Sequence, residues 1–427
     1  MGYSMTNSPF DINQRNITII AIVLVAAATI FGFFILQSPN ATTQTNNDDD
    51  GLVAEIKIGS LLPLTGDLSS NGEENKLAID LAVDDFNTHL KEIDANWHLK
   101  VVHEDTATSP VIALEKLTSL YSKGVNVVVG PSSSAELRVI KAYADSNGIV
   151  LISPSSTAPS LAIPGDNVFR LITDDTKQGP AIAKLLSDQK IKVIVPVWRG
   201  DTWGDGLSST AVNSFEKLGG ISDKGIRYNP ESPEFSAATS LLAGKVQFYV
   251  DKHGAANVGV LFLGFAEILQ FMQSASEHDS LDDVRWFGSD ANTKEHKLTD
   301  DPIGLEFSNN VLFTTTQGAV MDNPVYESVN ERIVDKLGRD PIFYAFSSYD
   351  AVWLAGKSIL DAQSTNANTI KDAIMQIAEK HNGAIGSTRL NDAGDLEYAN
   401  YEIWGIRGDD WVLVGLYDSE SDSIIKG

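Results

Sequence analysis

Short runs of apolar, β-branched residues alternate with longer segments of helical periodicity along most of the chain. The clearest case is the stretch VNVVVGPSSSAELRVIKAYADSNGIVLISPSST at residues 125–157. Residues 125–129 and 149–152 are apolar runs typical of strands that are buried on both faces. Between them, residues 135–145 carry apolar side chains at helical spacing and predict a helix. The stretch therefore predicts two parallel strands joined by a helix.

A hydroxyl-rich turn follows each of these two strands. The first turn contains serines at residues 132–134, directly before the helix, and the second reads SPSST at residues 153–157. Serines in this position cap the free N–H groups of a helix, which is one interpretation of the first turn. The alternative is a binding site, because those N–H groups and hydroxyls suit a small anion such as a carboxylate. Since adjacent parallel strands end at the same edge of a sheet, the paired turns favour a ligand crevice there.

The alternation of strand and helix continues on both sides of this stretch, and it restarts after residues 173–175. The predicted strands are residues 56–63, 97–103, 168–172, 192–197, 258–263, 284–287, 311–316, 398–406 and 411–417. The predicted helices are residues 73–90, 111–123, 177–189, 207–218, 235–252, 266–276, 324–337, 346–363 and 369–380. This pattern is typical of doubly wound parallel sheets covered by helices, and the restart predicts two α/β lobes.

The N-terminal part of the chain predicts a membrane anchor. Residues 17–36 form an uncharged, almost wholly apolar run, as long as the ~20 residues that a helix needs to cross a bilayer. Arg15 precedes the run, and no Lys or Arg follows it until Lys57, so residues 1–16 are predicted to be cytoplasmic and the rest extracellular. A cleaved signal peptide is the alternative, but its apolar core is only ~7–15 residues long. The polar residues 37–52 predict a flexible stalk.

Composition narrows the function classes. The 57 acidic residues outnumber the 32 basic ones and give a net charge of −25, whereas a nucleic-acid-binding protein needs a basic surface. The chain has no cysteine, which excludes disulfides, thiolate catalysis and cysteine-held metals. The seven histidines lack the spacing of a zinc motif, and no G-x-S-x-G elbow occurs. The sequence thus predicts no enzyme, no cofactor and no metal site.

Several segments together resemble the type I periplasmic binding-protein family, in particular the extracellular solute-binding proteins of branched-chain amino-acid ABC transporters. They are IKIGSLLPLTGDLSSNG, VNVVVGPSSSAELRVIKAYADSNGIVLISPSSTAPSL, VFRLITDD, WGDGL and WFGSDA, and the resemblance covers residues 55–417. It implies two α/β lobes that are joined by three hinge crossings and close over a ligand. Lobe 1 would comprise residues 53–172 plus 318–397, and lobe 2 residues 173–317 plus 398–427.

The resemblance also implies polar contacts to a ligand. Ser134 falls where the family binds a ligand carboxylate, which a hydroxyl at a helix N-terminus suits chemically. Ser155 and Thr157 fall in the second turn, where the family supplies a carbonyl and a hydroxyl or N–H group. Asp290 falls where the family places an acid that accepts the ligand ammonium, a charge-assisted pair.

Apolar contacts are implied in the same way. Trp203 and Phe265 fall at or near the family's aromatic positions in lobe 2, where rings form a wall for the ligand side chain. Core packing is the alternative for Phe265, whereas Trp203 lies in the Gly- and Asp-rich residues 198–206, which predict a turn. Asn71 departs from the family, which often has an aromatic residue there. This polar residue weakens the case for leucine, isoleucine or valine and leaves room for a more polar amino acid or a small amide.

The predicted function is that of a membrane-anchored, extracellular solute-binding protein. It would capture an amino acid or related small amide between its lobes and deliver it to the permease and ATPase subunits of an ABC transporter. The alternative is an extracellular ligand-sensing domain of a signalling system. Because residues 1–16 are too few for a cytoplasmic output domain, a sensor would need a partner chain.

Overall fold

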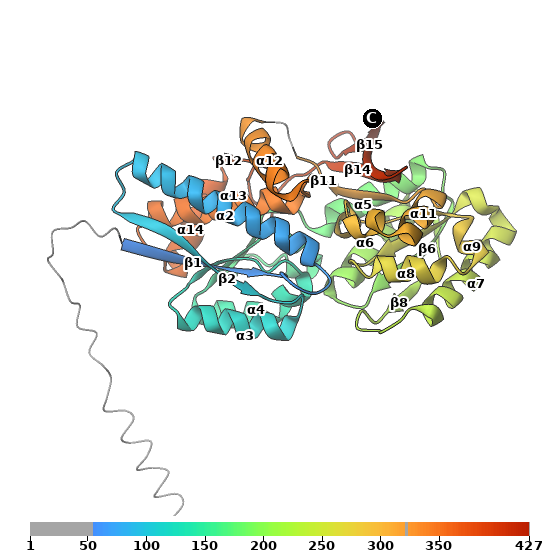
Figure 1. Cartoon of the computed structure of the whole chain (residues 1–427), viewed down its shortest axis with the longest axis horizontal. Coiled ribbons are helices and arrows are strands. Elements are labelled where there is room, and N and C mark those ends of the chain that lie inside the picture. The colour runs from blue at the N-terminus through green and yellow to red at the C-terminus, as the bar shows by residue number, and fades with distance from the viewer. Residues whose placement is uncertain (1–53, 321–322, 427) are drawn as a thin grey trace, which may run out of the picture. The chain divides into compact units, whose positions relative to one another are not determined.

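A computed structural model describes residues 54–320 and 323–426 of the chain. These residues form two α/β lobes, each built on its own β-sheet (Figure 1). The predicted anchor, stalk and cytoplasmic segment, residues 1–52, lie outside the described residues. Within the described residues, no helix is both long enough and apolar enough to cross a membrane.

Lobe 1 contains a five-stranded sheet whose strands follow the order β2-β1-β3-β4-β5 and are all parallel. Its N-terminal elements are β1 (Ala54–Leu62), α2 (Ser69–Glu92), β2 (Trp97–Asp105), α3 (Pro110–Ser122), β3 (Val127–Val129), α4 (Ser134–Asn147), β4 (Val150–Ser153) and β5 (Val168–Arg170). Its later elements are α12 (Pro324–Leu337), α13 (Phe343–Ala362), α14 (Ala367–Ala378), β12 (Asn382–Gly383) and β13 (Gly386–Ser387).

Both faces of the lobe 1 sheet are covered by helices, as its continuous apolar strands predict. Val127 and Val129 belong to the apolar core beneath α2, α13 and α14. Val128, which points to the opposite face, belongs to the core beneath α3 and α4. Because successive strand residues alternate between faces, a run of three valines buries side chains on both sides of the sheet.

Lobe 2 contains a larger mixed sheet. Its strands follow the order β16-β15-β14-β11-β10-β9-β6-β7, and β8 also pairs with β6. Its elements are α5 (Asp175–Asp188), β6 (Val193–Arg199), α6 (Thr202–Lys217), β7 (Ile221–Ser222), β8 (Ile226–Tyr228), α7 (Ser236–His253), β9 (Val258–Leu263), α8 (Ile268–Ala275), α9 (Asp279–Asp282), β10 (Arg285–Phe287), η3 (Asp290–Asn292), α10 (His296–Asp300), α11 (Pro302–Asn310), β11 (Thr314–Gly318), β14 (Tyr401–Arg407), β15 (Asp410–Asp418) and β16 (Ser423–Lys426).

The chain passes between the two sheets after β5, after β11 and before β14. The first and last of these passages touch, because the hydroxyl groups of Thr173 and Tyr401 are hydrogen-bonded at 2.7 Å. The predicted fold class, two α/β lobes of the periplasmic-binding type, is therefore confirmed. The exact residues that divide the lobes stay a prediction.

The predicted turn at residues 198–206 is wrong. Strand β6 continues to Arg199, and helix α6 begins at Thr202 with the Asp201 side chain accepting a hydrogen bond from the Gly204 N–H. The glycines that suggested a turn have a packing role, since a Cβ at residue 204 would lie 2.1 Å from the Arg199 carbonyl oxygen. Trp203 therefore lies in the first turn of a helix.

The predicted strand at residues 311–316 begins three residues later, at Thr314. Helix α11 comes before it, starting at Pro302 with Asp301 as its cap and ending at Asn310, and residues 311–313 connect the helix to the strand. Leu312 then adopts a positive φ of 51°, which ends the helix and turns the chain into β11. Helix α11 and the short edge strand β16 were not predicted.

Candidate ligand-binding site

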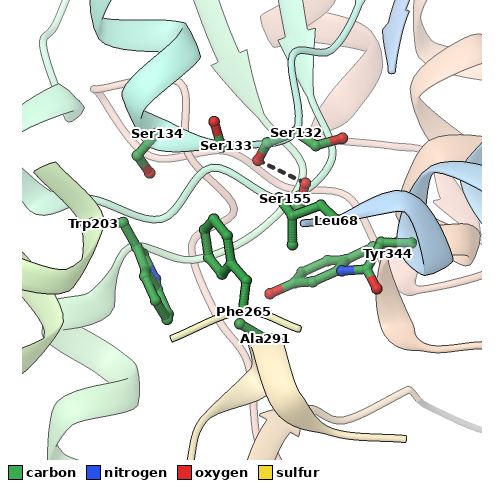
Figure 2. Close-up of a pocket in the computed structure, with 10 residues that line it drawn as sticks. Leu68, Ser132, Ser133, Ser134, Ser155, Trp203, Phe265, Ala291 and Tyr344 are labelled. Carbon is green, nitrogen blue, oxygen red and sulfur yellow. Dashed lines mark hydrogen bonds between the residues drawn. The ribbon is translucent and has the colours of Figure 1, made fainter. Parts of the chain in front are cut away.

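A small cavity of about 20 Å³ lies where the two lobes meet. This volume is far below the roughly 300–1,000 Å³ that small-molecule pockets have, so the lining side chains must move apart to admit a ligand. Serines from both hydroxyl-rich turns lie on one side of the space, and three aromatic rings lie on the other (Figure 2). The lining residues are Leu68, Asn71, Ser132, Ser133, Ser134, Ser155, Trp203, Phe265, Ala291 and Tyr344.

The N-terminus of α4 forms the polar wall of the cavity. Ser133 caps this helix: its hydroxyl accepts from the Glu136 N–H at 3.2 Å, and its carbonyl accepts from the Leu137 N–H at 3.0 Å. The N–H groups of Ser134 and Ala135, at the same helix end, make no hydrogen bond within the described residues. Capping therefore explains Ser133, and the N–H of Ser134, which lines the cavity, remains for a bound anion.

The two hydroxyl-rich turns are tied together by hydrogen bonds. The hydroxyl groups of Ser134 and Ser156 are 2.9 Å apart, and the Ser134 hydroxyl also accepts from the Ala158 N–H at 3.1 Å. The Ser155 hydroxyl donates to the Ser132 carbonyl at 2.9 Å (Figure 2). The structure thus brings Ser134 and Ser155 to one wall, in a rigid arrangement that positions the free N–H groups.

The aromatic wall comes from lobe 2. The rings of Trp203 and Phe265 have centroids 5.0 Å apart, and both side chains are nearly fully buried. Phe265 is part of an apolar core cluster and also lines the cavity. Its position therefore agrees with core packing and with a place in the wall of the cavity. The Arg199 guanidinium lies 3.7 Å from the Phe265 ring centroid on a cation–π contact.

Arg199 itself is firmly held. Its guanidinium donates to Asp201 at 2.6 Å and to Glu267 at 2.8 Å within lobe 2. It also lies 3.8 Å from the carboxylate of Asp67 in lobe 1. These contacts hold the Arg199 guanidinium against the Phe265 ring. They also connect this part of lobe 2 to Asp67 of lobe 1. The sequence offered no signal for this role, because it depends on groups far apart in the chain.

Other contacts join the lobes around the cavity. The Ser70 hydroxyl donates to Glu295 at 3.3 Å, and Arg138 donates to the Thr202 hydroxyl at 3.0 Å. Asn71 lines the cavity from the first turn of α2. The lobes are thus in contact on more than one side of the cavity, which describes a closed arrangement.

Asp290 and Thr157 do not line the cavity. The Asp290 carboxylate is buried behind Tyr344, whose hydroxyl donates a hydrogen bond to it across the lobes, and it also accepts from the Ala291 N–H at 3.0 Å. Burial raises the pKa of Asp290, and the hydrogen bond from Tyr344 acts in the opposite direction. Thr157 is buried beside the crossing into lobe 2, where its carbonyl accepts from the Asp175 N–H at 2.9 Å.

Tyr344 is the site residue that the sequence did not reveal. It lies in the first turn of α13, among apolar residues that read as helix core. Burial and the neighbouring Asp290 charge raise the pKa of its phenol well above the usual value, so the hydroxyl stays protonated. The Tyr344 oxygen can accept a further hydrogen bond while its hydroxyl donates to the Asp290 carboxylate.

A chain of Ser60, His103 and Asp80 in lobe 1 has the composition of a catalytic triad. The Ser60 hydroxyl lies 2.6 Å from His103 Nδ1, and His103 Nε2 lies 2.9 Å from the Asp80 carboxylate. Ser60 is completely buried within the β1 strand, so a substrate has no access to its hydroxyl. This chain is therefore a structural hydrogen-bond network.

Comparison with known proteins gives consistent matches. The sequence matches the family described as "Receptor family ligand binding region" over residues 74–409. It is 29% identical to an uncharacterized protein of Methanocaldococcus jannaschii, over 93% of this chain and 98% of the relative. It is 23% identical to Leu/Ile/Val-binding protein homolog 3 of Brucella melitensis, over 85% of this chain and 94% of the relative.

The fold matches that of a leucine-binding protein, LivK, from Thermotoga maritima. The TM-score is 0.75 at 22% identity, covering 86% of this chain and 99% of that one. At this identity, the likeness concerns the fold, and the family assignment rests on the match over residues 74–409. The chain belongs to the family of receptor ligand-binding regions, and its fold is like that of the leucine-binding protein LivK.

Proposed function

We propose that the protein is an extracellular solute-binding protein that captures an amino acid or a related small amide and delivers it to an ABC transporter. One observation carries this proposal: the cavity between the lobes combines a free helix N–H group with an aromatic wall, and a buried acid lies behind the Tyr344 hydroxyl. These are the groups that a small zwitterion with an apolar part would need.

The proposed pose follows from the chemistry of the two walls. The ligand carboxylate would bind the N–H group of Ser134, where the helix dipole favours a negative charge. The ligand ammonium would donate to the Tyr344 hydroxyl and be attracted by the Asp290 carboxylate behind it. The ligand side chain would rest on the rings of Trp203 and Phe265.

The relatives favour an amino-acid ligand, since one is named a Leu/Ile/Val-binding protein homolog and another a leucine-binding protein. Asn71 bears on which ligand this chain takes. A polar side chain in the lining suits a ligand with a polar group of its own, or a small amide. The proposal therefore includes amides beside the branched-chain amino acids.

A thermal-shift screen of the twenty amino acids and a set of small amides tests this function. A ligand present at about 100 times its Kd stabilises the folded protein by about 2.7 kcal/mol, so a true ligand should raise the Tm clearly. We expect a shift from at least one amino acid or amide and none from sugars or aromatic acids. Shifts from sugars or aromatic acids alone would overturn the proposal. Co-purification with a permease and an ATPase would favour transport, whereas co-purification with a kinase would favour sensing.

We also propose that residues 17–36 are retained as a membrane anchor, so that the ligand-binding lobes face outward. The support is the apolar length of this run and the position of Arg15 before it. Intact-mass analysis of protein extracted from membranes should give the mass of the uncleaved chain. A mature N-terminus between Thr29 and Thr45 would instead reveal a cleaved signal peptide.

A further inference from the structure

Three of the four serines that line the cavity use their hydroxyl groups within the protein. The Ser133 hydroxyl donates to the Glu136 carboxylate at 2.7 Å and accepts from the Glu136 N–H at 3.2 Å. The Ser134 hydroxyl is hydrogen-bonded to the second hydroxyl-rich turn, and the Ser155 hydroxyl donates to the Ser132 carbonyl. These three hydroxyls therefore serve mainly to hold the polar wall together.

Ser132 is the exception. It lines the cavity and is only 3% exposed, yet its hydroxyl has no hydrogen-bond partner within the described residues. Its backbone is held in place, because the Ser155 hydroxyl donates to its carbonyl at 2.9 Å. A buried hydroxyl that stays unpaired is unfavourable, so this one suits a polar group of a ligand.

Asn71 adds a second free polar group to the lining. It reaches the cavity from the first turn of α2, and its carboxamide makes no hydrogen bond to another of the described residues. A carboxamide and a hydroxyl can each donate and accept a hydrogen bond. Ser132 and Asn71 can therefore hold a ligand group that donates, accepts or does both.

The lining favours a group without charge. Among the described residues, no charged side chain lines the cavity. The Asp290 carboxylate lies behind the Tyr344 hydroxyl, and Arg199 contacts the Phe265 ring without lining the cavity. A charged ligand side chain would be buried there without a partner of opposite charge, which costs far more than burying a neutral group that is hydrogen-bonded.

The arrangement of the serines indicates which part of the ligand would meet Ser132. Figure 2 shows Ser134 at one end of the row of serines and Ser132 at the other. In the proposed pose, the ligand carboxylate occupies the Ser134 end, and the ammonium is assigned to the Tyr344 hydroxyl. The part that remains for Ser132 is the end of the ligand side chain.

Building on the proposed amino-acid function, we propose that Ser132 and Asn71 bind the end of the ligand side chain, and that this end is a carboxamide or a hydroxyl group. The ligand is then an amino acid with an uncharged polar side chain, rather than leucine, isoleucine or valine. The aliphatic part of the side chain still rests on the rings of Trp203 and Phe265. A methyl group at the end would leave the Ser132 hydroxyl buried and unpaired in the complex, and this difference creates the selectivity.

Two pairs of amino acids of matched size measure this selectivity. Asparagine and leucine differ by a carboxamide in place of two methyl groups, and threonine and valine differ by a hydroxyl in place of one methyl group. Calorimetric titration of the full chain gives the four affinities, and displacement titrations give the weak ones. We expect the polar member of at least one pair to bind about 5- to 150-fold more tightly, which corresponds to the cost of leaving a buried polar group unpaired.

Two variants assign the selectivity to the two residues. Ser132→Ala removes the free hydroxyl without breaking a hydrogen bond between described residues, so the unliganded variant should keep the Tm of the parent. Its affinity ratio for the selective pair should fall by about fivefold or more. Asn71→Leu keeps the size of the side chain and should shift the preference toward the apolar member of the pair.

Ser358→Ala is the matched control for the serine variant. The Ser358 hydroxyl, in α13, is also completely buried and has no partner within the described residues, but it does not line the cavity. The control makes the same chemical change away from the site, so its affinity ratio should equal that of the parent. A ratio that falls equally in both serine variants would overturn the assignment to Ser132.

The outcomes separate this inference from the proposed function. If no amino acid or amide stabilises the protein in the thermal-shift screen, the proposed function is wrong and this inference falls with it. If leucine and valine bind at least as tightly as asparagine and threonine, or if simple amides are the only ligands, the function stands and the inference is wrong. Affinity ratios that neither Ser132→Ala nor Asn71→Leu changes would also overturn it.

Discussion

Replacing Asp290 with asparagine should weaken the binding of a zwitterionic amino acid by about 10- to 150-fold. The substitution preserves the shape of the side chain and removes the charge that attracts the ligand ammonium through Tyr344. A hydrogen bond to a charged group contributes roughly 1.5–3 kcal/mol, which corresponds to this range of affinities. Tyr344→Phe should act in the same direction, and the double variant should lose less than the sum of the two changes, because both residues serve one contact.

Two controls accompany this prediction. Calorimetric titration measures the affinity of each variant for the amino acid and for an amide. Ser134→Ala should cost only about 0.5–1.5 kcal/mol, because the free N–H groups at the start of α4 remain in place. An uncharged amide should bind the Asp290 variant almost as well as the parent, since no ammonium contact is lost. If the confirmed ligand is a zwitterion and Asp290→Asn binds it as tightly as the parent does, the ammonium site lies elsewhere.

Replacing Asp395 with asparagine should lower the free energy of unfolding by about 3–5 kcal/mol. The Arg170 side chain is fully buried, and its Nε and Nη2 donate to the two oxygens of the Asp395 carboxylate, which is 1% exposed. Arg170 also donates to the carbonyls of Ser156 at 3.1 Å and Ala158 at 2.9 Å, beside the second hydroxyl-rich turn. Without the carboxylate, a buried guanidinium would remain unpaired next to the binding site.

The matched control lies two residues away, on the protein surface. Glu397 pairs with Arg389 at 2.8 Å, but both side chains are about half exposed, so Glu397→Gln should change stability by only about 0–1 kcal/mol. Denaturant unfolding of the two variants, followed by circular dichroism, compares them directly. Equal unfolding midpoints for both would show that the Arg170 pair contributes no more than a surface contact.

Much of the fold was predictable because local signals agree with the tertiary structure. Ser109 followed by Pro110 predicts the start of α3, and the structure has the cap and the first helical residue at these positions. The same signal at Asp301 and Pro302 begins α11, but the nine residues of that helix carry too little apolar periodicity to stand out. Gly204 had the opposite effect, because it suggested a turn where the structure has a helix. A glycine is needed there because the Arg199 carbonyl approaches its backbone closely, which is a tertiary contact.

The candidate site was predictable only in part. Ser134, Ser155, Trp203, Phe265 and Asn71 all line the cavity, because turns at strand ends and helix starts gather at one edge of each lobe. The position of Asp290 behind Tyr344 could not be predicted, since Tyr344 comes from a helix of the facing lobe.

The division of the cavity between the lobes has a kinetic consequence. The polar turns belong to lobe 1 and are held rigid by their own hydrogen bonds, whereas Trp203 and Phe265 belong to lobe 2. In the proposed function, an incoming amino acid can dock by its carboxylate on lobe 1 alone, before its side chain touches a ring. Association rates should thus be similar for different amino acids, and selectivity should reside in how long each one stays bound.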